Sequence, residues 1–148
     1  MINIQVGIVN KSNNPTPVYE TSGSSGMDIR AFLKEPIILK PLERTLIPTG
    51  LYFEIPEGYE IQIRSRSGLT LKRGLMVLNG IGTIDEDFRG ELGVILCNMS
   101  GEEQIVEPGD RIAQIVLMKV EKINFNVKEK ITEETDRGAG GFGHTGEK

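Results

Sequence analysis

Cysteine and histidine, two side chains that often serve as nucleophiles and metal ligands, are almost absent from this sequence. One cysteine, Cys97, and one histidine, His144, are too few for a disulfide framework or for a metal site built from these residues. Cys97 lies inside the apolar run 92–97, where a buried small hydrophobic residue is the expected role. Any chemistry in this chain has to come from carboxylates, arginines and uncharged polar groups.

A long apolar run and an excess of positive charge are also missing. No window reaches the roughly 18 apolar residues of a membrane-spanning helix, and the N-terminus has no basic stretch followed by an apolar one. The 17 basic and 21 acidic side chains leave a net charge of -4, opposite in sign to the surface that duplex nucleic acids usually require. These absences predict a cytoplasmic protein with neither a membrane nor a nucleic-acid partner.

The chain has instead a series of short apolar and β-branched runs separated by turn residues. With 148 residues, of which 38% are hydrophobic, it is long enough for one domain with a core. Proline and glycine mark turns at 56–58, 80–82 and 108–110. Many short strands with regular turns predict an all-β sandwich or barrel. The expected strands are 2–9, 37–39, 45–55, 59–65, 75–78, 92–97, 104–106, 111–120 and 123–127.

Two segments indicate their local structure most clearly. Apolar and polar residues alternate over 59–64, which predicts a half-buried strand. One face of this strand is expected to carry Tyr59, Ile61 and Ile63. The segment 67–74 is the one stretch expected to form a short helix, with Ser67 as its N-cap and Gly74 as its C-terminal stop.

Charged residues beside serine and glycine mark two candidate binding segments. In the segment 25–31, Asp28 comes shortly after a glycine, and taken alone it is interpreted as a turn carboxylate. In the segment 64–69, Ser67 and the amides after it can form a helix N-terminus facing an anion, with Arg66 beside it. A capped helix with solvated arginines explains the second segment equally well, so both interpretations stay open.

The segment 78–90 has the glycines of a tight β-hairpin and three acids in a row. Asp85 follows two apolar-leaning residues and can point inward, whereas the two acids after it have more reason to stay in water. A buried carboxylate needs a function or a partner. The alternative to a function is a salt bridge to Arg89 or Arg111.

Gln114 is a polar interruption of the apolar run 111–117. A buried glutamine must be hydrogen bonded, so it either braces the backbone or meets a ligand. The sequence leaves both roles open.

Residues 133–148 differ in composition from the domain predicted over 1–132. Five of the ten residues in 137–146 are glycine, which predicts a tail that is mobile when nothing is bound. A disordered end is the plain interpretation of such a composition. Arg137 and Phe142 argue for a function, because a flap that closes over a charged, aromatic ligand needs an anion-binding group and an aromatic face.

Taken together, these five segments resemble the five motifs of the homotrimeric dUTPase family, in the same order and with compatible spacing. The resemblance runs from residue 25 to residue 146, nearly the whole chain, and five ordered motifs are far more specific than any one of them. The matching segments are 26–31, 66–69, 82–90, 108–114 and 137–143.

The resemblance implies a jelly-roll-like β-barrel of the dUTPase-like, β-clip type, assembled as a homotrimer with each site built from all three chains. It implies hydrolysis of dUTP to dUMP and pyrophosphate with Mg²⁺ on the phosphates, which limits uracil in DNA and supplies dUMP for dTMP synthesis. Asp85 is then the base that activates a water for attack on the α-phosphorus, and Asp28 contacts the Mg²⁺ through a bound water. The phosphates are expected to be held by Arg66, Ser67, Gly68, Gln114 and, when the tail closes, Arg137.

The resemblance also implies which groups recognise the nucleoside. Backbone donors and acceptors are expected to pair with uracil, from the segment with Asn79, Gly82, Thr83, Ile84 and Asp85. Cytosine reverses this donor and acceptor pattern, and each unpaired buried polar group costs about 1–3 kcal/mol. Phe88, in place of the family's usual tyrosine, is expected against the deoxyribose. Phe142 in the tail is expected over the base, and Gly143 beside it is expected to bind the substrate.

Two other functions are considered beside this one. A structurally related dCTP deaminase needs a carboxylate near C4 of the base on the strand after the hairpin, and here that strand, 92–97, has no acid. A dUTP-responsive regulatory binding protein is the alternative from another class, with the nucleotide ordering the tail and thereby controlling a protein partner. Loss of partner binding on deletion of residues 134–148 would be its first support.

Overall fold

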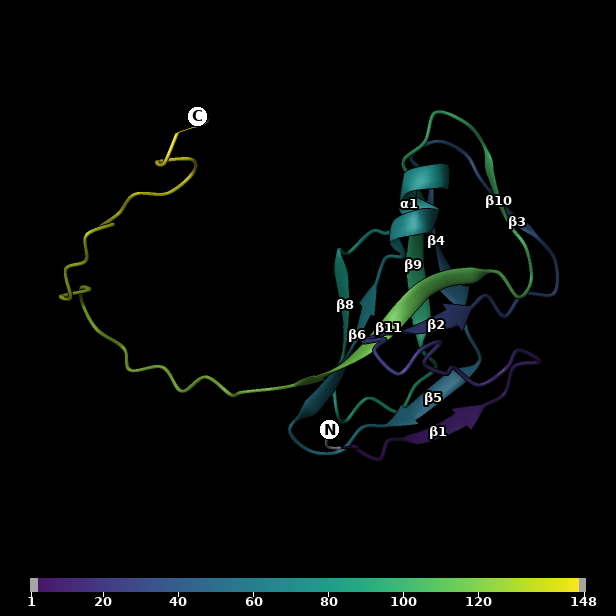
Figure 1. The fold of residues 1–148 in the computed structure, drawn as a ribbon, viewed down its shortest axis with the longest axis horizontal. Coiled ribbons are helices and arrows are strands. Elements are labelled where there is room, and N and C mark those ends of the chain that lie inside the picture. The colour runs from purple at the N-terminus through teal and green to yellow at the C-terminus, as the bar shows by residue number, and fades with distance from the viewer. Residues whose placement is uncertain (1–2, 147–148) are drawn as a thin grey trace.

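The computed structural model describes residues 3–146, which fold into a jelly-roll-like β-barrel with one short helix and a long C-terminal tail (Figure 1). The ends of the first expected strand and of the predicted tail, residues 2 and 147–148, lie outside this range. The elements are β1 Gly7–Asn10, β2 Met27–Arg30, β3 Ile37–Leu39, β4 Arg44–Pro48, β5 Leu51–Glu54, β6 Tyr59–Arg64, α1 Ser67–Arg73, β7 Leu75–Val77, β8 Ile81–Ile84, β9 Gly93–Asn98, β10 Gln104–Val106 and β11 Arg111–Lys119.

The strands pair in small sheets that share one core. The largest sheet has the order β2-β11-β6-β8, a second has the order β4-β9-β7, and two strand pairs, β1-β5 and β10-β3, complete the barrel. Every pairing in these sheets is antiparallel. In Figure 1, α1 lies at one end of the barrel, and β1 and β5 lie at the other.

Strand β6 confirms the alternation seen in the sequence. Ile61 and Ile63 are buried, while the residues between and beside them are only partly covered. β6 lies between β11 and β8, so its inward residues join the central core. The alternation predicts this correctly because burial on one face of a strand repeats every second residue.

Expected strand boundaries fail where the chain turns a corner. The expected strand 45–55 is two strands, β4 and β5, because Gly50 has a φ of 69° and the chain changes sheets there. The Thr49 hydroxyl donates to the Leu92 carbonyl at 2.6 Å and holds this corner. Of the described part of the expected strand 2–9, residues 3–6 are not in a strand, and the residues from Gly7 onward pair with β5.

The last expected strand, 123–127, is absent from the described chain, whereas β2 and β8 fall outside the expected strands. Residues Ile123, Phe125 and Val127 are 76%, 78% and 91% exposed. Apolar alternation in this segment is real, but a strand forms only when a neighbouring strand satisfies its backbone hydrogen bonds.

The helix forms where the sequence predicts it, but its N-cap is one residue earlier. α1 begins at Ser67, and the N-cap is Arg66 in extended conformation with no side-chain cap, so Ser67 is not the N-cap. Gly74 ends the helix as predicted, with a φ of 65° and its N–H donating to the Thr70 carbonyl at 2.9 Å. The N-cap prediction failed because the pairing of β6 with its neighbouring strands sets where the strand ends and therefore where α1 begins.

The core confirms the expected role of Cys97, whose side chain is 2% exposed. Burial raises the pKa of the Cys97 thiol, partly offset by a backbone hydrogen bond from Met76. A protonated, enclosed thiol is a poor nucleophile.

No helix of residues 3–146 is long and apolar enough to cross a membrane.

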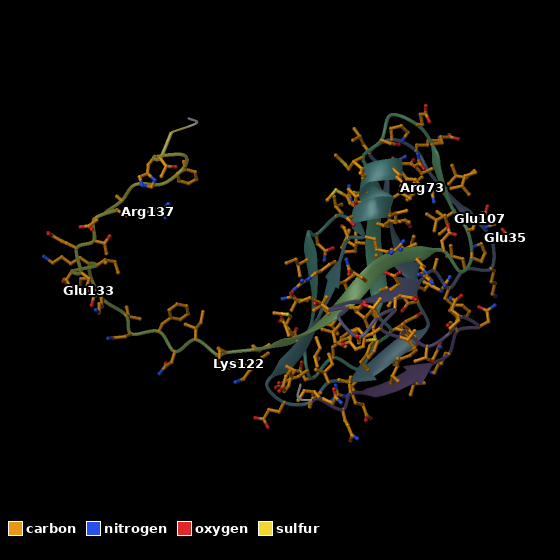
Figure 2. All side chains as sticks on the ribbon, in the orientation of Figure 1. Glu35, Arg73, Glu107, Lys122, Glu133 and Arg137 are labelled. Carbon is orange, nitrogen blue, oxygen red and sulfur yellow. The ribbon has the colours of Figure 1, made fainter. Side chains whose placement is uncertain are left out.

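The chain leaves the barrel after β11 and runs away from it (Figure 1). Lys122, Glu133 and Arg137 follow one another along this extended segment in Figure 2. Phe142 is fully exposed. β11 ends at Lys119, so the boundary proposed between 132 and 133 stays a prediction, as does the mobility of the tail.

Candidate active site

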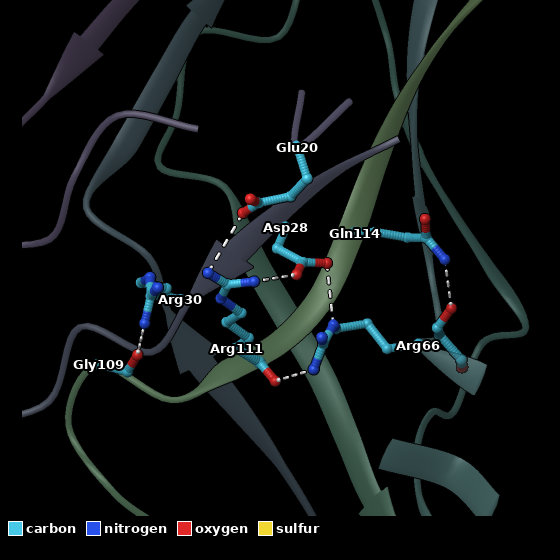
Figure 3. Close-up of polar contacts among 8 residues, drawn as sticks. Glu20, Asp28, Arg30, Arg66, Gly109, Arg111 and Gln114 are labelled. Atoms are coloured by element: carbon cyan, nitrogen blue, oxygen red, sulfur yellow. Dashed lines mark hydrogen bonds and ion pairs between the residues drawn. The ribbon is translucent and has the colours of Figure 1, made fainter. Parts of the chain in front are cut away.

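Asp28 lies at the centre of an ion-pair network on β2 (Figure 3). Its Oδ1 accepts from Arg66 Nε at 2.9 Å and its Oδ2 accepts from Arg111 Nη1 at 3.2 Å. Arg66 Nη1 also donates to the Arg111 carbonyl at 3.3 Å, and Arg111 Nη2 lies 3.2 Å from Glu20 Oε1. The interpretation of Asp28 as a turn carboxylate is wrong, because Asp28 lies within a strand and is held by two arginines.

Three elements bring this network together. Asp28 is opposite Gln114 across the β2–β11 pairing, and Gln114 is opposite Arg64 across the β11–β6 pairing. Arg66 lies two residues after the end of β6, beside Asp28 and just before α1. The register of these strands therefore brings the predicted phosphate-binding segment, 64–69, next to the predicted metal-binding segment, 25–31.

Ser67 and Gly68 open α1 and are exposed. The Ser67 hydroxyl makes no hydrogen bond within residues 3–146. Because the first turn of a helix leaves its N–H groups without intrahelical partners, these residues can meet an anion. Arg66 is half-buried and salt-bridged, so the interpretation as a solvated arginine is wrong.

Gln114 braces the backbone, one of the two roles left open by the sequence. Its Nε2 donates to the Ser65 carbonyl at 2.9 Å, directly before the Arg66 cap. Gly26 leaves the space that its Oε1 occupies, since a Cβ at that position would overlap this oxygen. A contact from Gln114 to a ligand stays a prediction.

Most of the residues predicted to recognise the nucleoside line one cleft of about 250 Å³, whereas Asp85 lines another. The walls of the first cleft include Asn79, Gly82, Thr83, Ile84 and Phe88. β8 is an edge strand of its sheet, so one side of its backbone is free of strand pairing within the described chain. Free donors and acceptors at the wall of a cleft can pair with a planar polar ligand.

The hairpin predicted over 78–90 is wrong. The chain does turn at Gly80, which has a φ of 76°, but β7 pairs with β9 and β8 pairs with β6. The glycines indicated the turn correctly. They carry no information on which strands pair, because partner choice depends on long-range packing.

Asp85 is exposed, so the expectation that it points inward is wrong. Ile84 is half-buried and opposite Ile61, so the next residue faces the other way. Glu86 turns inward instead and accepts from the Gly58 N–H at 2.7 Å. The alternative of an ion pair with Arg89 or Arg111 is not found within the described residues.

The two groups of predicted residues lie at opposite ends of β6. Asp85 follows the residue opposite Ile61 and lines a cleft with Tyr59. Arg66 lies beyond Arg64 at the other end, where it lines a separate cleft with Arg111. Three strand steps, roughly 10 Å, separate Ile61 from Arg64 alone. One chain therefore does not bring Asp85 to the arginines.

The tail residues are also apart from both groups. Arg137 Nε donates to the Gly140 carbonyl at 2.9 Å, inside the tail. Phe142 has a φ of 49° and Gly143 a φ of 88°, so the chain bends there. The structure does not bring these three residues to the barrel clefts.

No cluster of three or more His, Cys, Asp or Glu side chains suited to a metal occurs in the part of the chain that the structure describes. Mg²⁺ usually keeps several waters and is bound through one or two carboxylates and substrate phosphates. Asp28 offers one carboxylate beside two arginines. These residues fit an ion bound mainly by substrate phosphates better than an ion enclosed by protein ligands.

Two members of the network were missed or misplaced by sequence reasoning. Arg111 was considered only as a partner for Asp85, yet it contacts Asp28. Its position opposite Arg30 at the start of β11 can be recognised only after the strands are paired. Glu20 lies outside every motif, and no spacing pattern indicates it.

Comparison with known proteins gives consistent matches over nearly the whole chain. The sequence profile of the family described as dUTPase matches residues 12–146. A Finegoldia magna protein named deoxyuridine 5'-triphosphate nucleotidohydrolase is 58% identical over 143 residues, covering 97% of this chain and 99% of that protein. A Fusobacterium nucleatum protein of the same name is 53% identical over 146 residues, 99% of each chain. A solved dUTPase of Staphylococcus bacteriophage 80alpha with dUPNHPP has a TM-score of 0.82 and 25% identity, covering 97% of this chain and 99% of that chain.

Proposed function

The chain belongs to the dUTPase family, and from this premise we propose that it hydrolyses dUTP to dUMP and pyrophosphate in a site shared between chains. The observation that carries the proposal is the 58% identity with a dUTP nucleotidohydrolase over 97% of the chain. The product dUMP then feeds dTMP synthesis, and removal of dUTP keeps uracil out of DNA.

Asp85 is proposed as the general base. Its exposed carboxylate has no hydrogen bond or ion pair from another side chain within residues 3–146, so its oxygens are free to accept a proton from water. The water attacks the α-phosphorus, its proton passes to Asp85, and pyrophosphate leaves. This step needs no covalent intermediate.

The phosphates are proposed to lie against the start of α1. Arg66, Ser67 and Gly68 supply a guanidinium, a hydroxyl and unpaired backbone N–H groups, all of which favour anions. Gln114 holds the Ser65 carbonyl and so fixes the backbone just before them. Donors placed in advance stabilise the charge that grows on the leaving pyrophosphate.

Asp28 is the residue proposed to hold Mg²⁺, through a bound water. Arg66 and Arg111 fix both of its oxygens, and each oxygen keeps a lone pair for water. When bound, the ion supplies positive charge that offsets the phosphate oxygens. Arg66 therefore has two tasks, because it positions Asp28 and contacts phosphate.

The edge of β8 is proposed to read uracil. Gly82 is buried in the β6 pairing, where a Cβ would lie 3.1 Å from Ile63 Cβ, and Asn79 and Thr83 line the same cleft. Fixed backbone groups reject cytosine because they would be left unpaired. Phe88 lines this cleft and is proposed to cover the sugar.

A homotrimer with shared sites is proposed from two observations. Asp85 and Arg66 lie at opposite ends of β6, so a complete site needs residues from more than one copy. Ile123, Phe125 and Val127 are exposed in strand-like alternation, which indicates a segment covered by another chain. The tail residues Arg137, Phe142 and Gly143 are proposed to close over a site of this assembly.

Mixing two inactive variants tests the shared site. Asp85→Asn and Arg66→Ala should each lose activity, and a mixture unfolded and refolded together should regain it. If each site takes Asp85 and Arg66 from different chains, a 1:1 mixture restores about one half times one half, or about a quarter, of the sites. The measurement is pyrophosphate release per chain. No recovery in mixtures shown to be mixed trimers would contradict shared sites.

A substrate panel tests the activity itself. Wild-type protein with Mg²⁺ should release pyrophosphate from dUTP and release little from dCTP, dTTP or UTP, since the β8 edge fits uracil and Phe88 crowds a 2'-hydroxyl. Release from dCTP at a rate equal to that from dUTP would refute uracil recognition by β8. Tight dUTP binding without release would refute hydrolysis.

A further inference from the structure

Glu20 is the outermost member of the network around Asp28 and belongs to none of the motifs. It lies in the connection before β2, its side chain is 58% exposed, and its Oε1 lies 3.2 Å from Arg111 Nη2. For residues 17–25, this ion pair is the one polar side-chain contact with the rest of the described barrel. Glu20 and Asp28 also line the same cleft, together with Arg30 and Arg111.

The charges around this position nearly cancel. The network and the two clefts beside it contain four arginines, Arg30, Arg66, Arg73 and Arg111. They also contain three carboxylates, Glu20, Asp28 and Asp110. The net charge of this region is therefore about +1 with every group ionised. A nucleoside triphosphate carries about -4, and one Mg²⁺ lowers this to about -2.

Glu20 differs from the other two carboxylates in what holds it. Asp28 has both oxygens bound by arginines, and Asp110 Oδ2 accepts from the Glu107 N–H at 2.9 Å and lies 3.9 Å from Arg73 Nη1. Glu20 has one ion pair, and the structure shows no partner for its Oε2 among residues 3–146. Its side chain is also the most exposed of the three carboxylates, so it is the one most accessible to an approaching anion.

We propose that Glu20 makes the site select the Mg²⁺ complex of the nucleotide over the metal-free nucleotide. This inference rests on the proposed function, because it assumes that the triphosphate binds beside Arg66 and Arg111. Coulomb repulsion scales with the charge of the ligand, so the Glu20 carboxylate repels metal-free triphosphate about twice as strongly as the Mg²⁺ complex. Glu20 thereby weakens binding of a nucleotide that lacks the ion needed for its hydrolysis.

The inference can be tested by binding rather than turnover. The probe is dUpNHpp, a dUTP analogue with NH in place of the oxygen that bridges the α- and β-phosphorus atoms. It is titrated into the protein calorimetrically, once with Mg²⁺ and once with EDTA. Glu20→Gln should bind the metal-free analogue about 5-fold more tightly and the Mg²⁺ complex about 2-fold more tightly than wild type. The preference for the Mg²⁺ complex therefore falls roughly 2- to 3-fold, and the difference disappears in about 1 M NaCl, where screening is strong.

Two variants separate charge from other effects. Glu20→Asp keeps the charge and should keep the wild-type preference. Glu35→Gln makes the same charge change at an exposed residue with no hydrogen bond or ion pair in the described chain, and it should also leave the preference unchanged. Exposed ion pairs contribute little to stability, so Glu20→Gln should melt at the wild-type temperature.

The outcomes distinguish this inference from the proposed function. An unchanged Mg²⁺ preference in Glu20→Gln, with tight wild-type binding, would overturn the role of Glu20 alone. An equal fall in Glu35→Gln would overturn it as well, because the effect would then be one of total charge. No binding of dUpNHpp by wild type in either condition would refute the proposed function, and the role of Glu20 with it.

Discussion

Replacement of Asp85 by asparagine is expected to lower kcat for dUTP hydrolysis by about 10²- to 10⁴-fold, the usual contribution of a general base. The amide has nearly the same shape as the carboxylate but does not accept the proton of the attacking water. Asp85 is exposed and unpaired by any other side chain of residues 3–146, so the free energy of unfolding should stay the same. Pyrophosphate release at saturating dUTP and Mg²⁺ measures the loss.

Asp87→Asn is the matched control. Asp87 is an exposed acid in the same turn and also lines the cleft with Asp85. It should keep kcat within about 2-fold, since surface substitutions away from special contacts have small effects. Both variants should bind dUpNHpp like wild type. Retention of kcat by Asp85→Asn would contradict its role as the base.

Deletion of residues 133–148 is expected to lower kcat/KM by about 10²- to 10⁴-fold. On the roles proposed for the tail, the deletion removes a charged hydrogen bond from Arg137 to phosphate, about 1.5–3 kcal/mol, and stacking of Phe142 on the base, about 1–3 kcal/mol. Thermal stability should not change, because residues 133–139 are exposed and the hydrogen bonds of the tail are internal. Steady-state kinetics and thermal unfolding measure the two quantities.

Single substitutions locate the effect within the tail. Arg137→Ala and Phe142→Ala should each account for part of the loss. Lys130→Ala removes an exposed cation before the glycine-rich stretch and should leave kcat/KM unchanged. If the truncated chain kept the kcat/KM of the full chain, the tail would have no role in binding dUTP.

Local patterns in the sequence predicted the elements whose structure depends on neighbouring residues. Ile61 and Ile63 were assigned to the buried face of β6 because burial on a strand repeats every second residue. Gly74 was recognised as the helix stop because it adopts a positive φ without strain. The wrong N-cap at Ser67 shows the limit, since the start of α1 is set by the end of β6 pairing.

Features that depend on distant residues were not predictable. Asp28 was assigned to a turn because its partners, Arg66 and Arg111, are 38 and 83 residues away in sequence. The direction of Asp85 follows from the pairing of Ile84 with Ile61, which no single segment reveals. The family resemblance suggested roles for Asp85 and Arg66, but only the structure showed that they lie at opposite ends of β6.

The separation of Asp85 and Arg66 along β6 has a consequence for enzyme assays at low protein concentration. Under the proposed shared site, a lone chain carries two incomplete half-sites, and turnover requires that copies meet. Specific activity should therefore fall on dilution, in proportion to the loss of assembled chains under the law of mass action. In such an assay, a surface substitution that weakens association would look like a catalytic defect. Adding an excess of an inactive variant that still associates would restore the activity lost on dilution.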